Sequence, residues 1–141
     1  MRWWEKYIGI PFKPMGRNES GVDCVGLCML IFKNEKGVIV DDTVQKYTAE
    51  EMRHFKSLKH INKLIDDELT KWHEVSKKEI EPYDLCLYTV HGIECHAAIC
   101  VDERRVLHVE EKHPVHAAPI DIPGYVLTRV LRHESQIEKE V

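Results

Sequence analysis

The chain has 141 residues, 43% of them hydrophobic, and a formal net charge of −4, which suits a single domain spanning residues 1–141. The negative charge argues against general nucleic-acid binding, which depends on neutralising phosphates with lysine and arginine. The sequence contains no run long enough to span a bilayer and no signal-peptide stretch at its start, so we expect synthesis in the cytoplasm without membrane insertion.

The first half of the chain predicts a loop followed by helices. Pro11, Pro14 and several glycines disfavour regular structure before residue 23. Apolar residues then recur at positions 24, 27, 28 and 31, which predicts a buried helix over residues 23–34, with Gly37 past its end. A short edge strand is expected at 38–40. The capping-box pattern at 48–51 opens a further helical stretch with apolar positions up to residue 72.

The second half of the chain predicts an antiparallel sheet. Strands are expected at 85–90, 93–101, 106–110 and 125–131, with turns at 91–92 and 102–105. We expect a loop around Pro114 and Pro119, and a polar tail over about 134–141. Histidines 54, 60, 73 and 133 are expected on solvated surfaces. Helices followed by antiparallel strands predict an α+β fold.

Cys24 is the candidate nucleophile, because it lies where the loop ends and the helix begins. The helix N-terminus stabilises a thiolate, the reactive form of cysteine. The alternative is an unreactive core cysteine, since position 24 shares a helix face with Leu27 and Cys28. Gly21 and Gly26 favour the nucleophile, because glycine leaves space for a substrate backbone. The five cysteines show no disulfide-framework spacing, which favours a reduced protein.

His96 and His108 are the candidate base and orienting residue, because strands flank them both. If the turn between these strands holds three residues, Ala98 faces His108, and His96 then lies diagonally on the same face. A two- or four-residue turn would separate them. In this arrangement His96 takes the thiol proton to give a thiolate–imidazolium pair, and His108 fixes its orientation. The backbone N–H of Cys24 is the expected oxyanion donor.

Four segments follow one another in an order and spacing typical of one family. They are Gly9-Ile10-Pro11-Phe12, Asp23-Cys24-Val25-Gly26-Leu27, Pro82-Tyr83-Asp84-Leu85, and the pair His96-Ala97-Ala98-Ile99-Cys100 with Val106-Leu107-His108-Val109. The set resembles the Gly-x-Pro-Tyr, Asp-Cys-Ser-Gly-Leu, Pro-Gly-Asp-Leu and paired-histidine motifs of the NlpC-type cysteine peptidases. These are papain-like hydrolases of bacterial cell-wall peptides.

The resemblance implies a fold, a reaction and a set of site residues. It implies a papain-like fold, with cleavage of peptidoglycan stem peptides between D-glutamate and a diamino acid. The short form resembles the branch encoded with phage tails, which implies tail-tip proteins as partners and delivery by a virion tail to the cell wall. We expect no cofactor and no metal. The implied catalytic residues are Cys24, His96 and His108, and the implied substrate-binding residues are Phe12, Asp23, Val25 and Gly26.

Two departures from the family pattern leave the substrate open. Phe12 stands in place of tyrosine and Val25 in place of serine, so a different amide or ester, or a weaker activity, is an alternative. A second alternative is a structural tail-assembly protein that keeps the fold. A third is a metal-binding module built from Cys86, Cys95, His96 and Cys100, whose spacing matches no common zinc arrangement.

Overall fold

The computed structural model describes residues 2–40 and 71–137. Its N-terminal part contains a 3-10 helix, Glu5–Tyr7, the short strands β1 (Arg17–Asn18) and β2 (Gly21–Val22), and helix α1 (Cys24–Ile31). The helix continues as a π-helical segment, Phe32–Lys36. The remaining elements are β3 (Trp72–Val75), β4 (Leu85–Val90), β5 (Ile93–Cys100), β6 (Arg105–Glu110), β7 (His113–Pro119), β8 (Val126–His133) and a 3-10 helix, Glu134–Gln136.

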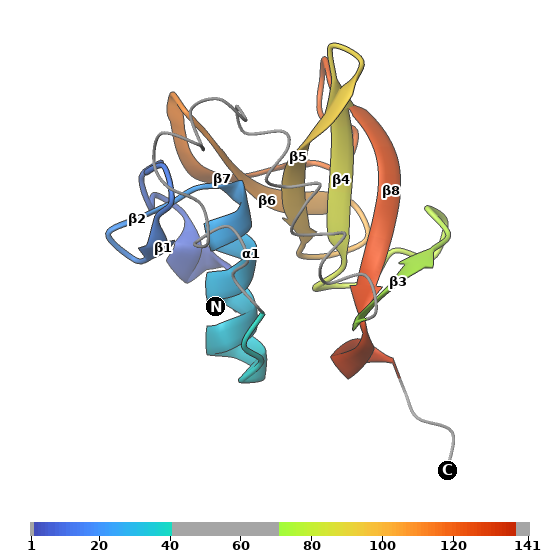
Figure 1. The fold of residues 1–141 in the computed structure, drawn as a ribbon, viewed down its shortest axis with the longest axis horizontal. Coiled ribbons are helices and arrows are strands. Elements are labelled where there is room, and N and C mark those ends of the chain that lie inside the picture. Colours follow the sequence, from blue (N-terminus) through green and yellow to red (C-terminus); the bar gives the residue numbers. More distant parts are fainter. Residues whose placement is uncertain (1, 41–70, 138–141) are drawn as a thin grey trace.

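Strands β3 to β8 form one antiparallel sheet in the order β3-β8-β4-β5-β6-β7. Helix α1 packs against β5 and β6, and Figure 1 shows it on the side of the molecule where β6 and β7 lie, away from β3. A helix packed on an antiparallel sheet is the α+β arrangement predicted from the sequence. None of the helices in the described parts of the chain combines the length and apolar character that crossing a membrane requires.

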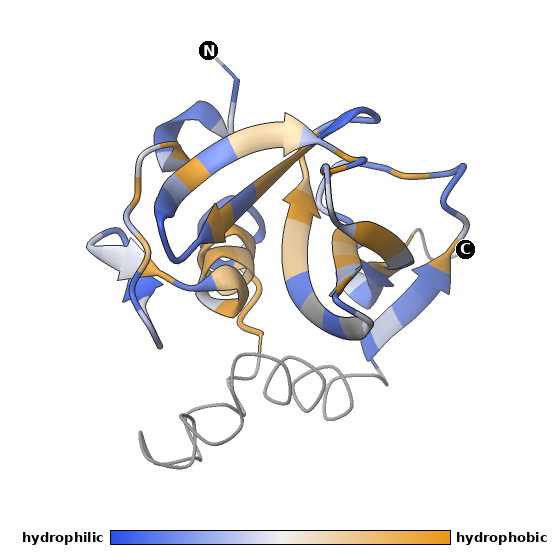
Figure 2. Ribbon diagram, turned by 90° about the horizontal axis from the view of Figure 1, so that it is seen from above, coloured by the Kyte–Doolittle hydropathy of each residue, from blue (hydrophilic) through white to orange (hydrophobic). Residues whose placement is uncertain are grey.

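Helix α1 is buried on almost every side because it is apolar all round. All its residues except Met29 are buried, and Figure 2 shows the helix in hydrophobic colours along its length. A helix of this composition belongs in a core. The cluster that joins it to the sheet includes Leu27, Leu87, Ile99 and Leu107. This packing fixes the N-terminus of α1, where Cys24 lies, against the sheet.

A second hydrophobic cluster is formed by the alternate side chains of the same strands, which point to the other face of the sheet. It contains Cys86 and Tyr88 from β4, Ala98 and Cys100 from β5, and Val106 from β6. Successive side chains of a strand point to opposite faces. Residues that share the parity of Ala98 and Val106, including His96 and His108, therefore belong to this second face of the strands.

The loop predicted around Pro114 and Pro119 is wrong, because the structure has strand β7 there. These prolines are the second and last residues of the strand. Strand β7 ends the sheet order, and an edge strand tolerates proline because one side of its backbone has no ladder partner. The prolines make this strand unrecognisable in the sequence, because a strand tolerates them only at the edge of a sheet.

Two other predictions are wrong: the edge strand expected at 38–40 and the helical stretch expected to reach residue 72. Residues 38–40 form no strand, because the Val38 N–H donates to the Phe32 carbonyl at 3.2 Å and so completes the helix end. Trp72, expected at the end of the helical stretch, begins β3 and packs edge-on against His133. That contact leaves His133 5% exposed, although a solvated surface was expected. The helical positions over 48–70 lie outside the described residues.

Candidate active site

Asp23 shapes the start of α1. Its Oδ1 accepts hydrogen bonds from the Gly26 backbone N–H at 2.7 Å and from Arg17 Nη1 at 2.8 Å, and its Oδ2 accepts one from the Met15 N–H at 3.1 Å. An aspartate in this position satisfies a donor that the first helical turn leaves unpaired. The cap therefore makes Cys24 the first residue of the helix and ties the preceding loop to it.

Cys24 is a buried thiol held next to strand β5. It is 8% exposed. Burial raises its pKa to about 12 and the Asp23 carboxylate acts in the same direction, whereas the backbone N–H groups of Ala97 and Val25 oppose the rise. The influence of the Ala97 N–H places the sulfur beside the residue that follows His96. The thiol is therefore protonated near neutral pH in the free protein.

The two predicted histidines are in direct contact. Ile99 pairs with Leu107 and Cys100 with Val106, which confirms the register of a three-residue turn. The His96 Nε2 and His108 Nδ1 atoms lie 3.0 Å apart in a hydrogen bond, and the two residues are only 9% and 2% exposed. The base and orienting residue expected from the sequence therefore form a buried pair.

Burial keeps both rings neutral. It lowers the pKa of His96 to about 4. It also lowers the pKa of His108 to about 4, where the nearby His96 and His116 act in the same direction. Burial therefore favours the neutral form of both the Cys24 thiol and the His96 ring. Among the described residues, no hydrogen bond joins the Cys24 sulfur to the His96 ring.

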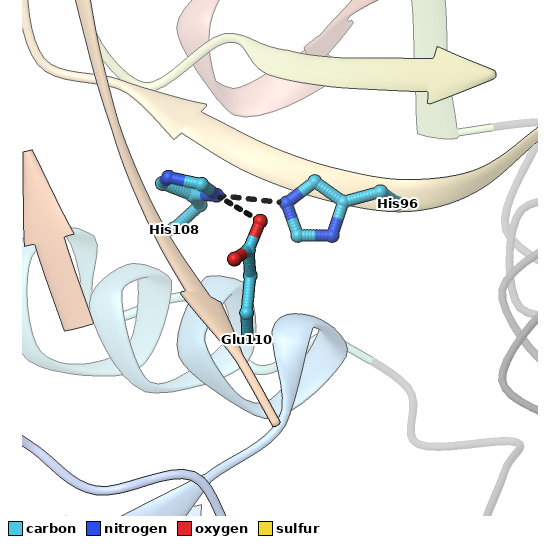
Figure 3. A group of neighbouring side chains, drawn as sticks. All are labelled: His96, His108 and Glu110. Carbon is cyan, nitrogen blue, oxygen red and sulfur yellow. Dashed lines mark hydrogen bonds and ion pairs between the residues drawn. The ribbon is translucent and has the colours of Figure 1, made fainter. Parts of the chain in front are cut away.

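Glu110 is a third polar group at the histidine pair, and Figure 3 shows its carboxylate directed toward His108 and His96. Its Oε1 lies 3.8 Å from His108 Nδ1 and accepts a hydrogen bond from the Tyr125 hydroxyl. Burial alone would raise the pKa of Glu110, but the hydrogen bond from that hydroxyl, with a smaller electrostatic effect of the neighbouring histidines, holds it below its ordinary value. The pair therefore faces an ionised carboxylate held by a tyrosine.

Glu110 and Tyr125 are absent from the residues predicted from the sequence. Glu110 lies two positions after His108 on the same strand, so a period of two could have placed it on the same face. The ring of Tyr125 packs edge-on to His96, with centroids 5.1 Å apart. Nothing in the sequence near Tyr125 signals this contact, because the residue comes from the loop before β8.

The four residues expected to bind substrate have structural contacts. Val25 is 2% exposed in the core, and Phe12 forms an isolated bridge with Val22 and packs against the same core. Asp23 is the helix cap described above. A Cβ atom at Gly26 would lie 1.9 Å from the Gly16 carbonyl oxygen. Gly26 therefore admits the protein's own loop, and the space expected there for a substrate backbone is filled.

Two of the cysteines considered as metal ligands, Cys86 and Cys100, do not join His96 in a ligand group among the described residues. The Cys86 and Cys100 sulfurs lie 3.0 Å apart, both residues are fully buried, and they belong to the second hydrophobic cluster. His96 instead bonds His108. These contacts do not support the part of the metal module built on Cys86, His96 and Cys100, while the Cys95 side chain lies outside the described groups.

A helix that begins at a buried cysteine, packed on an antiparallel sheet that carries two bonded histidines, defines a papain-like fold. The chain belongs to the NlpC/P60 family, whose sequence model matches residues 9–133. Membership of this family supports an enzymatic role. The resemblance to NlpC-type peptidases stated from the motifs is confirmed at the level of the family and the fold.

Solved structures show the same fold. The NlpC/p60 domain of the peptidoglycan hydrolase SagA is similar with a TM-score of 0.62 and 18% identity, and the similarity covers 90% of each chain. A lipoprotein-like NLP/P60-family protein of Staphylococcus aureus gives a TM-score of 0.58 at 18% identity, over 88% of this chain and 37% of that one. No curated protein sequence matches the chain.

Proposed function

We propose that this protein is a cysteine hydrolase that cleaves amide bonds in peptides of the bacterial cell wall. The observation that carries the proposal is the buried hydrogen bond between His96 and His108, on the strand that also places a backbone N–H at the Cys24 sulfur. Family membership and the similarity to SagA, a peptidoglycan hydrolase, support the choice of substrate. Cys24 is the nucleophile, His96 the general base and His108 the orienting residue.

The hydrogen bond between the histidines assigns their tautomers in the active form. His96 must leave Nδ1 unprotonated to accept the thiol proton, so its own proton lies on Nε2 and is donated to His108 Nδ1. His108 then carries its proton on Nε2. The thiolate attacks the amide carbonyl, and the backbone N–H of Cys24 is positioned at the helix start to stabilise the oxyanion. His96 returns the proton to the leaving amine, and the acyl group stays on Cys24 as a thioester. Water then hydrolyses this thioester and frees the thiol.

The timing of the proton transfer follows from the environment of the two groups. Transfer from Cys24 to His96 is uphill in the free protein, since burial favours the neutral form of both. Catalytic hydrogen bonds often tighten only when substrate is bound. Proton transfer therefore accompanies attack on a bound carbonyl, and the glutamate at position 110 supplies the negative charge that stabilises the imidazolium as it forms.

The finer specificity is part of the same proposal. The bond between D-glutamate and a diamino acid is the expected target, because the segments around Cys24 and His96 resemble those of endopeptidases with this specificity. Association with a phage or prophage tail, and delivery by it to the cell wall, is the expected setting. A structural tail-assembly role is the second candidate, favoured by the protonated, buried Cys24 thiol.

The test is digestion of purified muropeptides by wild type, Cys24→Ala and Cys28→Ala, with products identified by mass spectrometry. Cys28 is the matched control, because it is a buried cysteine one turn further along the same helix. We expect wild type and Cys28→Ala to release a peptide, and Cys24→Ala to lose at least about a thousandfold in rate. Cleavage by Cys24→Ala at a rate close to that of wild type would refute the mechanism, and no cleavage by wild type would favour the structural role.

A further inference from the structure

Three side chains at the histidine pair bring metal-ligating atoms together. Ligand atoms of His96, His108 and Glu110 all lie within 4.8 Å of one another, and Figure 3 shows the three groups converging from strands β5 and β6. The two ring nitrogens are 3.0 Å apart and the carboxylate is 3.8 Å from one of them. Two ligands of a tetrahedral zinc ion lie about 3.3 Å apart, so small side-chain rotations bring these atoms to that spacing.

The protonation states of the three groups also match a metal site. Metal ions bind neutral imidazole and ionised carboxylate. Near pH 7 an ordinary histidine is largely neutral and an ordinary glutamate is ionised. The Tyr125 hydroxyl holds the carboxylate, as outer partners commonly do for metal ligands.

We propose that His96, His108 and Glu110 form a binding site for a divalent transition-metal ion of the zinc class, and that the ion switches the hydrolase off. The proposed inhibition depends on the proposed hydrolase function, whereas binding of the ion does not. The chemical class follows from the ligands: two imidazoles and one carboxylate suit zinc and its neighbours, while magnesium and calcium prefer oxygen ligands throughout. These ligands differ from the cysteine-rich set considered in the sequence.

Inhibition follows from the tautomers. The ion needs the lone pairs of His96 Nε2 and His108 Nδ1, so the proton of neutral His96 must move to Nδ1. That nitrogen then cannot accept the thiol proton. His108 keeps its proton on Nε2, which is buried and has no hydrogen-bond partner among the described groups. Metal binding therefore removes the base and breaks the hydrogen bond between the histidines in one step.

The binding test uses the full chain and zinc itself, measured by titration calorimetry and by competition with a chromophoric chelator. We use the Cys24→Ala background, so that the nucleophile is not a ligand and activity is not needed. We expect one ion per chain with a Kd of about 10⁻⁶ M or tighter, weakened at least about tenfold by Glu110→Gln. The matched control is His73→Ala, because His73 is an exposed histidine on β3.

A second measurement guards against loss of fold. Zinc should raise the melting temperature of the Cys24→Ala protein, and should raise that of the Glu110→Gln variant by much less. Equal zinc affinity with and without Glu110→Gln would overturn the site, as would loss of binding in His73→Ala.

The inhibitory half is tested separately on wild type, by adding zinc to the muropeptide digestion and then removing it with a chelator. Reversible loss of cleavage at the zinc concentration that fills the site supports inhibition. Cleavage that continues with the site filled overturns it. If zinc binds and wild type never cleaves, the binding site stands while inhibition and the proposed function both fail. If wild type cleaves and zinc does not bind, only the metal site fails.

Discussion

Single residues at the start of β4 show how this chain departs from its family motif without losing the fold. Tyr83 stands where the motif has glycine, and its φ of 73° lies in the left-handed region that favours glycine. Its ring stacks on Trp3 with centroids 4.4 Å apart, and Lys36 Nζ lies 4.1 Å from its centroid. These contacts stabilise a backbone conformation that a tyrosine otherwise disfavours.

The neighbouring Asp84 should be a stability determinant. It is fully buried and accepts hydrogen bonds from Arg132 Nε at 2.9 Å and Nη2 at 2.8 Å. Asp84→Asn removes the buried negative charge that pairs with Arg132, so we expect the free energy of unfolding in urea to fall by about 3 kcal/mol. Glu81→Gln is the control, because Glu81 meets Arg132 at 3.6 Å with a side chain 62% exposed. A change below about 1 kcal/mol is expected there, and equal losses would contradict the assignment.

At the scale of elements, helix α1 packs tightly against the loop that precedes it. Gly26 lies in the first turn, where the Gly16 carbonyl passes close to its Cα, and Arg17 bridges the loop to Asp23. The capped end of α1 therefore has one position relative to the loop. Because Cys24 is the first residue of this helix, the same contacts fix the position of its thiol relative to strand β5.

Gly26→Ala tests this packing. In an ordinary helix interior, alanine stabilises by about 1 kcal/mol relative to glycine. Here the added Cβ would lie 1.9 Å from a backbone oxygen, so we expect the sign to reverse and the free energy of unfolding to fall by about 1–3 kcal/mol. Chemical denaturation followed by circular dichroism measures it. An unchanged or higher stability would show that the loop moves freely from the helix.

At the scale of the whole molecule, the buried histidines link stability to pH. The pKa of each lies at about 4 in the folded protein against an ordinary 6.5. Above pH 6.5 both are neutral whether the chain is folded or unfolded. Between 6.5 and 4 the unfolded chain binds protons that the folded chain does not, so stability falls as the pH falls.

Urea denaturation between pH 7.5 and 4 measures this dependence. We expect the free energy of unfolding of wild type to be level above pH 6.5 and to decline below it. His108→Asn should decline less steeply over the same window, because one of the two groups is gone, while exposed His73→Ala should follow wild type. Parallel curves for wild type and His108→Asn would contradict the assignment.

Much of the site could be predicted from local sequence. The helix beginning near Cys24 and the strands that carry His96 and His108 depend on residues close in the chain. The sequence left the length of the turn between these strands open, and the structure decided it. Local signals failed where a distant neighbour decided the outcome. Strand β7 keeps its prolines because it lies at a sheet edge, and Trp72 joins a strand because β8 is beside it.

The sequence by itself determined the family motifs, the α+β order of elements and the spacing of the cysteine and histidines. These follow from periodicity and capping, which act over a few residues. Only the tertiary structure decided that burial favours the neutral forms of Cys24 and His96, and that Glu110 lies beside the histidine pair. The physical reason is that burial and charge depend on groups brought together from separate strands, and no local pattern records how much water they exclude.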